Sequence, residues 1–143
     1  MHEIQRSALV PYSAEEMFDL VNDIESYPQF MRGCTEARII SQSEDEMVGE
    51  LCLSKAGIKQ RFTTRNCLQR PRQIKMNLVE GDFSRFNARW EFEELTDTAC
   101  RIKFFMAFEF ESRLLGFAAE KLFAGTASDL VDSLVKRARE VHS

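Results

Sequence analysis

Between Thr35 and about Phe110, apolar and polar residues alternate along the chain. A period of two, repeated over five segments, predicts an antiparallel sheet with one dry and one wet face. Turn sequences such as Ala56-Gly57 and Gly81-Asp82 separate the segments. The residues expected on the dry face are Met47, Gly49, Leu51, Leu53, Ile58, Gln60, Phe62, Thr64, Leu68, Ile74, Met76, Leu78, Phe86, Ala88, Trp90, Phe92, Ile102, Phe104, Met106, Phe108 and Phe110.

The first 30 residues predict a strand followed by a short helix. Residues 3–10 have a strand pattern, which Pro11 ends. Ser13 and Glu16 then have the spacing of a capping box, in which each side chain bonds the backbone N–H of the other residue. A helix of about ten residues should follow. Tyr27-Pro28 should end any helical continuation, because the residue before proline is disfavoured in the α region.

The last 30 residues change to a spacing of three and four, which predicts one long amphipathic helix. Such a helix buries its apolar stripe only against the dry face of the sheet, so the chain should be a single α+β domain over residues 1–143. The stripe consists of Phe123, Ala127, Leu130, Val131, Leu134, Ala138 and Val141.

The composition argues against catalysis and metal binding. The only two histidines lie near the chain ends, at positions 2 and 142, so a nucleophile–histidine pair is not expected. Four cysteines, at positions 34, 52, 67 and 100, have no zinc-site spacing. No apolar run of transmembrane length occurs, and the thiols suit a reducing cytoplasm. We therefore expect a cytoplasmic, non-enzymatic protein that holds no metal and no covalent cofactor.

Several segments, in this order, resemble the START-like, helix-grip superfamily. More narrowly, the chain is similar to the polyketide cyclase/dehydrase-like family, which includes coenzyme-Q-binding proteins and the bacterial ribosome-association toxin. The segments that carry the resemblance are residues 12–21, residues 23–30 with Cys34, residues 62–66, Gly81-Asp-Phe83 with Trp90-Glu-Phe92, and residues 135–139. The family usually has proline where Asp82 stands and glycine where Ala88 stands. The resemblance implies a curved antiparallel sheet wrapped around the long C-terminal helix, with two short helices after the first strand.

The resemblance also implies an apolar cavity between the sheet and the long helix. We expect it to bind a polyprenyl quinone such as ubiquinone, or a similar lipid, in support of respiratory electron transfer. A tightly packed core has the same sequence pattern, so both interpretations stay open. The residues expected to line the cavity are Leu51, Leu53, Phe62, Thr64, Ile74, Met76, Phe86, Trp90, Phe104, Met106, Phe108 and Phe123.

Apolar residues crowd the start of the long helix, at Leu114, Leu115 and Phe117. These three residues are candidates for peripheral contact with the inner membrane, through which a lipid would load. The alternative is a helix start covered by the loop at residues 27–31.

Positive charge is segregated along the chain. The net charge is −4, which gives no general case for nucleic acid, and we expect no DNA partner. Residues 51–79 nevertheless contain only basic charges, and Lys59, Arg61, Arg65 and Lys75 should share the wet face of neighbouring strands. Such a patch suits RNA or anionic lipid, although a solvated sheet face is the simpler explanation. The alternative function is that of the toxin, which binds the large ribosomal subunit and blocks subunit joining and translation initiation.

Overall fold

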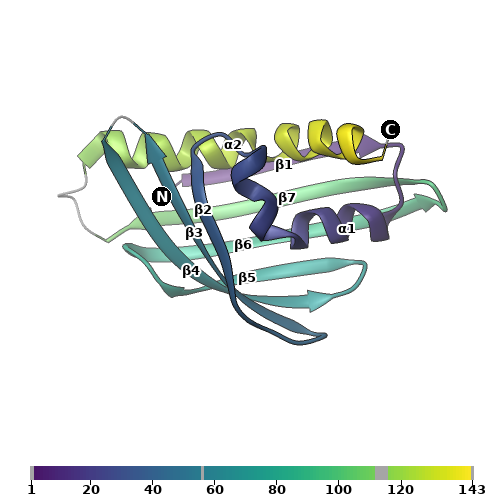
Figure 1. The fold of residues 1–143 in the computed structure, drawn as a ribbon, viewed down its shortest axis with the longest axis horizontal. Helices are drawn as coiled ribbons and strands as arrows, with labels where there is room; N and C mark the ends of the chain where they lie inside the picture. The colour runs from purple at the N-terminus through teal and green to yellow at the C-terminus, as the bar shows by residue number, and fades with distance from the viewer. Residues whose placement is uncertain (1, 56, 112–115, 143) are drawn as a thin grey trace.

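Seven strands form one curved antiparallel sheet in the computed structural model, which describes residues 2–55, 57–111 and 116–142 (Figure 1). The strand order is β1-β7-β6-β5-β4-β3-β2. Strands β2 to β6 each lie beside the next strand in the sequence, whereas β1 pairs with the last strand, β7. The strands are β1 (His2–Val10), β2 (Cys34–Gln42), β3 (Glu46–Lys55), β4 (Ile58–Gln69), β5 (Gln73–Glu80), β6 (Phe83–Thr96) and β7 (Ala99–Phe110). The predicted turn at Gly81-Asp82 lies between β5 and β6, and Gly57 lies between β3 and β4, whereas Ala56 lies outside the described residues.

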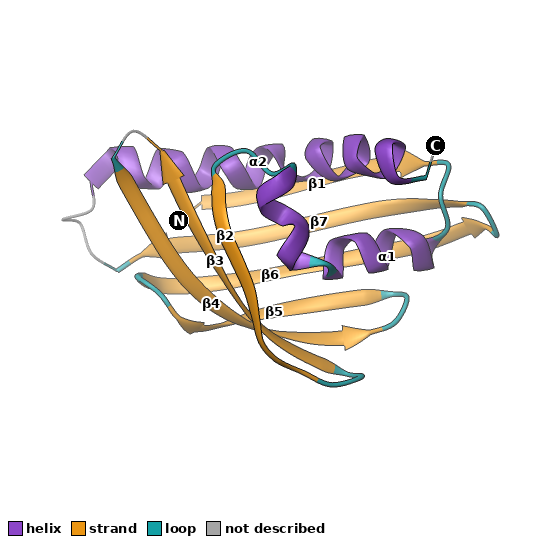
Figure 2. Ribbon diagram, in the orientation of Figure 1, coloured by secondary structure: helices purple, strands orange, loops and turns teal. Residues whose placement is uncertain are grey.

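The helices cover one face of the sheet (Figure 2). The long helix α2 (Gly116–Val141) runs beside β1, while α1 (Ala14–Asn22) packs on β6 and β7. The short 3₁₀ helix η1 (Ile24–Gln29) lies against β2. This is the START-like helix-grip arrangement that the sequence predicted, with two short helices after the first strand and a long helix at the end.

The start of α1 confirms the predicted capping box. The Glu16 backbone N–H donates to Ser13 Oγ at 3.1 Å, and the Ser13 backbone N–H donates to Glu16 Oε1 at 3.1 Å. The expectation for Tyr27-Pro28 was wrong, because η1 continues through Pro28. The helical run breaks earlier, at Asp23, and the Tyr27 carbonyl accepts hydrogen bonds from two residues after the proline. Pro28 is the fifth of the six residues of η1, and its fixed φ of about −65° fits the 3₁₀ backbone although it cannot donate a hydrogen bond.

The apolar stripe of α2 is buried from Phe123 to Ala138, as predicted. Its expected last member was wrong, because Val141 is 50% exposed. Val141 is the final residue of α2, one turn beyond Ala138. Beneath the stripe, the dry-face residues are buried or half-buried, and Trp90 stacks near Phe104 with ring centroids 4.4 Å apart. The core therefore lies between the concave face of the sheet and α2.

Candidate functional site

The predicted cavity residues meet in the space between the sheet and α2. A chamber of about 40 Å³ lies there, and Thr126, Ala127 and Leu130 of α2 close it on one side. Tyr27 and Met31 of the η1 segment close it on another side. Eight of the predicted residues line it: Leu51, Leu53, Phe62, Met76, Trp90, Phe104, Met106 and Phe123.

A second chamber of about 30 Å³ lies under α1 and η1. It shares Leu51, Met76 and Trp90 with the first chamber, and it contains the predicted residues Thr64 and Ile74. The Thr64 hydroxyl donates to the Asn66 side-chain oxygen at 2.8 Å, so these two polar groups bond each other. This bond uses the hydroxyl proton of Thr64, so Thr64 does not donate to a ligand in this conformation.

The size of these chambers decides what they hold. Ligand pockets in proteins typically measure about 300–1,000 Å³, whereas one water needs roughly 10–15 Å³. Chambers of about 40 and 30 Å³ thus have room for a few waters and not for a quinone ring. The interior is packed in this conformation, and a large ligand enters only if side chains move.

The remaining predicted cavity residues, Phe86 and Phe108, belong to a cluster of phenylalanine rings at the β6–β7 end of the core. Phe83 contacts Phe86 at 5.2 Å between ring centroids, and Phe123 contacts Phe108 at 4.7 Å. Edge-to-face contacts of this kind fill space and stabilise a core. The cluster consists of Phe62, Phe83, Phe86, Phe108, Phe110 and Phe123.

Burial stabilises the neutral forms of two titratable groups beside the interior, Tyr27 and Cys34. Burial raises the pKa of the Tyr27 phenol far above its ordinary value, and its hydroxyl donates to the Val21 carbonyl. Burial also raises the pKa of the Cys34 thiol to about 11. Neither group is suited to proton transfer at neutral pH. Within the described part of the chain, no group of three or more His, Cys, Asp or Glu side chains is placed to hold a metal.

A surface groove of about 450 Å³ runs between α2 and the loop at Gly33. Thr126 lines both this groove and the larger inner chamber. The groove is open beside Gly125, since a side-chain carbon added there would meet no atom within 4 Å. The groove is the place where the interior approaches the surface. Sequence reasoning missed it, because Gly33 and Gly125 give no apolar signal.

The predicted basic patch is present, but neighbouring strands neutralise part of it. Lys59, Arg61 and Arg65 of β4 and Lys75 of β5 are exposed on the outer face. Arg61 contacts Glu36 at 2.7 Å and Glu50 at 2.8 Å. Its hydrogen bonds lower the pKa of both carboxyl groups.

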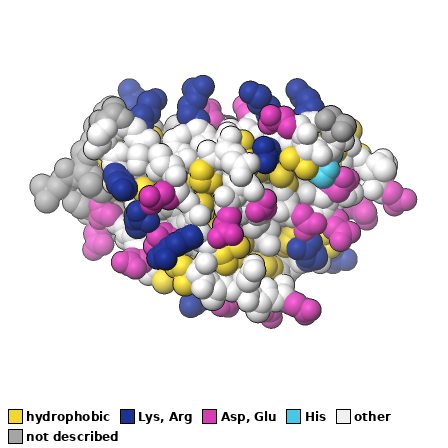
Figure 3. All heavy atoms as spheres, in the orientation of Figure 1, with side chains coloured by type: hydrophobic (Ala, Val, Ile, Leu, Met, Phe, Trp, Pro, Cys, Tyr) yellow, Lys and Arg dark blue, Asp and Glu magenta, His cyan; other side chains and the backbone are white. Residues whose placement is uncertain are grey.

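The second arginine of the patch is also paired. Arg65 contacts Glu46 of β3 at 3.3 Å. The acids of β2 and β3 come before the basic segment in the sequence, and only the strand register places them beside it. Elsewhere, Lys and Arg side chains project along the edge occupied by α2, with acidic side chains spread over the same view (Figure 3).

The proposed membrane-contact residues are only partly placed. Leu114 and Leu115 lie outside the described residues, and Phe117 is described only through its backbone at the start of α2. Among the helices of the described ranges, none has the length and apolarity needed to cross a bilayer.

Comparison with known proteins identifies relatives along the whole chain. The family model for polyketide cyclase / dehydrase and lipid transport matches residues 10–135. The chain is 46% identical over 143 residues to the ribosome association toxin RatA of Escherichia coli strain K12, covering 100% of this chain and 90% of that protein. It is 23% identical to the mitochondrial coenzyme Q-binding protein COQ10 homolog B of Xenopus laevis, covering 98% of this chain and 59% of that protein.

A solved structure with the same fold is the Zhui aromatase/cyclase from Streptomyces sp. R1128. It has a TM-score of 0.84 and 13% identity, and the match covers 99% of this chain and 96% of that one. At this identity the likeness concerns the fold alone. The curated relatives thus have names of toxins and of a coenzyme-binding protein, while a fold neighbour is a cyclase.

Proposed function

We propose that this chain, which belongs to the polyketide cyclase / dehydrase and lipid transport family, associates with the ribosome as its toxin relative is named to do. In this proposal it binds the large subunit, hinders subunit joining and so inhibits translation initiation, without catalysing a reaction. The observation that carries the proposal is the packed interior, whose chambers of about 40 and 30 Å³ are too small for a lipid.

Similarity supports the same choice. The 46% identity to a ribosome association toxin extends over the whole chain, whereas the identity to the coenzyme Q-binding relative is 23%. A protein with a filled core acts through its surface, and the outer face of the sheet carries exposed cations. The surface is therefore the part of the molecule to test first.

Sedimentation in sucrose gradients tests the proposal. The purified protein is mixed with ribosomes whose subunits have been separated at low magnesium concentration, at low and at moderate salt. We expect the protein to travel with the large subunit and to reduce the 70S peak when magnesium is restored. Protein that stays at the top of the gradient at every salt concentration contradicts the proposal.

Quinone binding is a second candidate, and one observation favours it. The groove beside Gly125 reaches Thr126, which also lines the inner chamber, so a short movement of α2 would connect the chamber to the surface. Mass spectrometry of organic extracts from the purified protein tests this candidate. A co-purifying polyprenyl quinone at a stoichiometric amount supports it, and consistently empty protein excludes it as the main function.

A further inference from the structure

The outer face of the sheet contains a row of four side chains that lie opposite one another on adjacent strands. Lys75 of β5 is the register partner of Arg89 on β6, and Arg89 is the partner of Phe105 on β7. Phe105 is in turn the partner of Gln5 on β1. We call these four residues the outer row. Directly opposed side chains in antiparallel strands lie about 4.5–5.5 Å apart at Cβ, so they act as one surface.

Two cations of the outer row face each other without a carboxylate. Like charges at opposed positions destabilise a sheet. Within the described ranges, neither Lys75 nor Arg89 makes an ion pair, whereas Arg65 contacts Glu46 at 3.3 Å. A polyanion that binds across the two strands would relieve this repulsion.

Acids lie on the rows to either side of the outer row, with Glu91 on one side and Glu3 on the other. Glu91 is the register partner of Lys103, and Glu93 contacts Lys103 at 3.3 Å and Arg101 at 3.7 Å. Two cations thus lie beside the two carboxylates of β6. The field at Lys75 and Arg89 stays positive, although the chain carries −4 overall.

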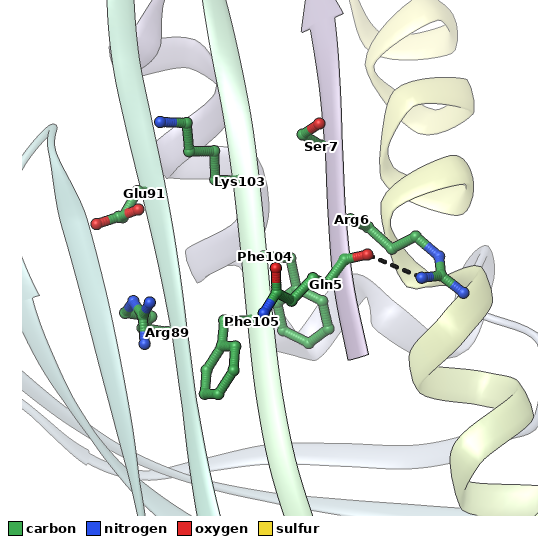
Figure 4. A pocket seen from close by; sticks show the side chains of 8 residues that line it. All are labelled: Gln5, Arg6, Ser7, Arg89, Glu91, Lys103, Phe104 and Phe105. Atoms are coloured by element: carbon green, nitrogen blue, oxygen red, sulfur yellow. Dashed lines mark hydrogen bonds between the residues drawn. The ribbon is translucent and has the colours of Figure 1, made fainter. Parts of the chain in front are cut away.

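A groove with an aromatic floor passes beside the outer row (Figure 4). It has a volume of about 280 Å³, and its lining includes Gln5, Arg89, Glu91, Lys103 and Phe105. The Arg89 guanidinium carbon lies 4.5 Å from the centroid of the Phe105 ring. This cation–π contact places the guanidinium over the ring, and the half-buried Arg89 keeps part of its side chain in contact with solvent.

We propose that the outer row binds a single-stranded segment of RNA. Lys75 and Arg89 contact consecutive phosphates, while a base stacks on the platform of Arg89 and Phe105. Gln5 supplies hydrogen-bonding groups at the far end of the row. The inference rests on the proposed association with the ribosome, since it names the chemistry through which the protein recognises its partner.

Unpaired RNA fits this face better than a membrane does. The guanidinium covers the Phe105 ring, so the row offers little apolar area for insertion into a bilayer. Asn77 and Asn87, register partners on the adjacent row, add polar groups, and that row ends at Glu3 of β1. Such a mixture of cations, amides and one stacked ring is typical of surfaces that bind single-stranded nucleic acid.

Titration with a short, fluorescently labelled oligouridine tests the inference. The variant Lys75→Gln with Arg89→Gln should weaken binding at least tenfold, because it removes both cationic contacts to phosphate. The log–log salt slope should fall by about 1.4, or about 0.7 for each phosphate contact on a single strand. The matched control is Lys136→Gln with Arg139→Gln on exposed positions of α2, which removes the same charge and should bind like the wild type.

Cys67 provides an independent readout in the unmodified protein. It is exposed and is the register partner of Lys75, whereas Cys34, Cys52 and Cys100 are buried. Saturating oligouridine should therefore slow the alkylation of Cys67. Unchanged alkylation in the presence of bound RNA would place the RNA elsewhere and overturn the inference.

Ribosome sedimentation separates failure of the inference from failure of the proposed function. If the wild type and the Lys75/Arg89 variant sediment equally well with large subunits, the proposed function stands and the outer row is not its RNA contact. If the wild type neither sediments nor binds oligouridine, both are wrong. Wild-type protein that floats with phosphatidylglycerol vesicles but ignores oligouridine shows that the row recognises a lipid surface, which also overturns the inference.

Discussion

The substitution Phe123→Ala measures how firmly the interior is packed. Phe123 of α2 is 2% exposed. Its ring lies 4.7 Å from that of Phe108, 5.1 Å from that of Phe83 and 5.5 Å from that of Phe62, between centroids. It is thus the contact through which the helix holds the phenylalanine cluster.

The expected loss follows from these contacts. Removing a buried phenylalanine ring costs about 3–5 kcal/mol when the surroundings do not collapse into the gap. Total stabilities are about 5–15 kcal/mol, so the variant should lose a large part of its free energy of unfolding. For a domain of this size, the same loss lowers Tm by roughly 10 °C or more.

Urea unfolding followed by circular dichroism provides the measurement. Val141→Ala is the control, because Val141 lies on the same helix and is 50% exposed, and it should change stability by less than about 0.5 kcal/mol. A cost below about 1 kcal/mol for Phe123→Ala would refute the packed interior. In that case Phe123 does not fill the space between sheet and helix, and an open cavity would explain the interior better than a packed core.

Three further substitutions test particular contacts. Ser13→Ala should cost about 1 kcal/mol at neutral pH in urea unfolding. The variant keeps the Ser13 backbone N–H, whose bond to Glu16 is the main cause of the lowered pKa of that carboxyl. The carboxylate's stabilisation is present above the ordinary pKa and is lost as the pH falls through the lowered one, so most of this pH dependence should survive in the variant, and its complete loss contradicts the assignment. Gly49→Ala should cost about 1–3 kcal/mol by thermal melting, because the new Cβ would lie 2.3 Å from the buried Ile24 Cδ1; an unchanged Tm shows that Ile24 moves freely. Arg61→Glu should lower Tm more than Arg61→Gln, because it adds a third negative charge beside two carboxylates, and equal Tm values would show that this ion-pair network has no effect on stability.

The order of elements was predictable because the period of the apolar pattern changes where the structure changes. Backbone geometry alone explains both predictions. A period of two between residues 46 and 110 indicates strands, and a spacing of three and four after residue 122 indicates a helix. The error at Tyr27-Pro28 has a local cause, since the fixed φ of proline fits a 3₁₀ helix and the Tyr27 carbonyl still accepts hydrogen bonds from Phe30 and Met31. Val141 was misplaced because a sequence pattern does not show where the covering sheet ends.

The candidate site was less predictable than the fold, because it depends on volumes and on register. The sequence pattern at Leu51, Met76 and Trp90 is the same for an open cavity and for a filled one, and only the packed coordinates distinguish them. The partners of Arg61 come from strands whose register the sequence does not specify. Arg89 alternates with Ala88 and Trp90 of the dry face, so its outward direction was predictable. Its neighbours Phe105 and Lys75 were not, because they depend on the register of β6 with β7 and with β5.

The same fold can serve a lipid carrier or a surface-binding protein, and side-chain volume decides between these uses. The helix-grip arrangement leaves a space between sheet and helix whose width depends on the residues at its rim. Here six phenylalanine rings occupy one end, and the chambers that remain are small. A filled core is rigid, so it presents the outer strands as a fixed surface. The outer row is held in register by backbone hydrogen bonds of four strands, and this rigidity suits recognition of a fixed partner better than the opening and closing that lipid loading requires.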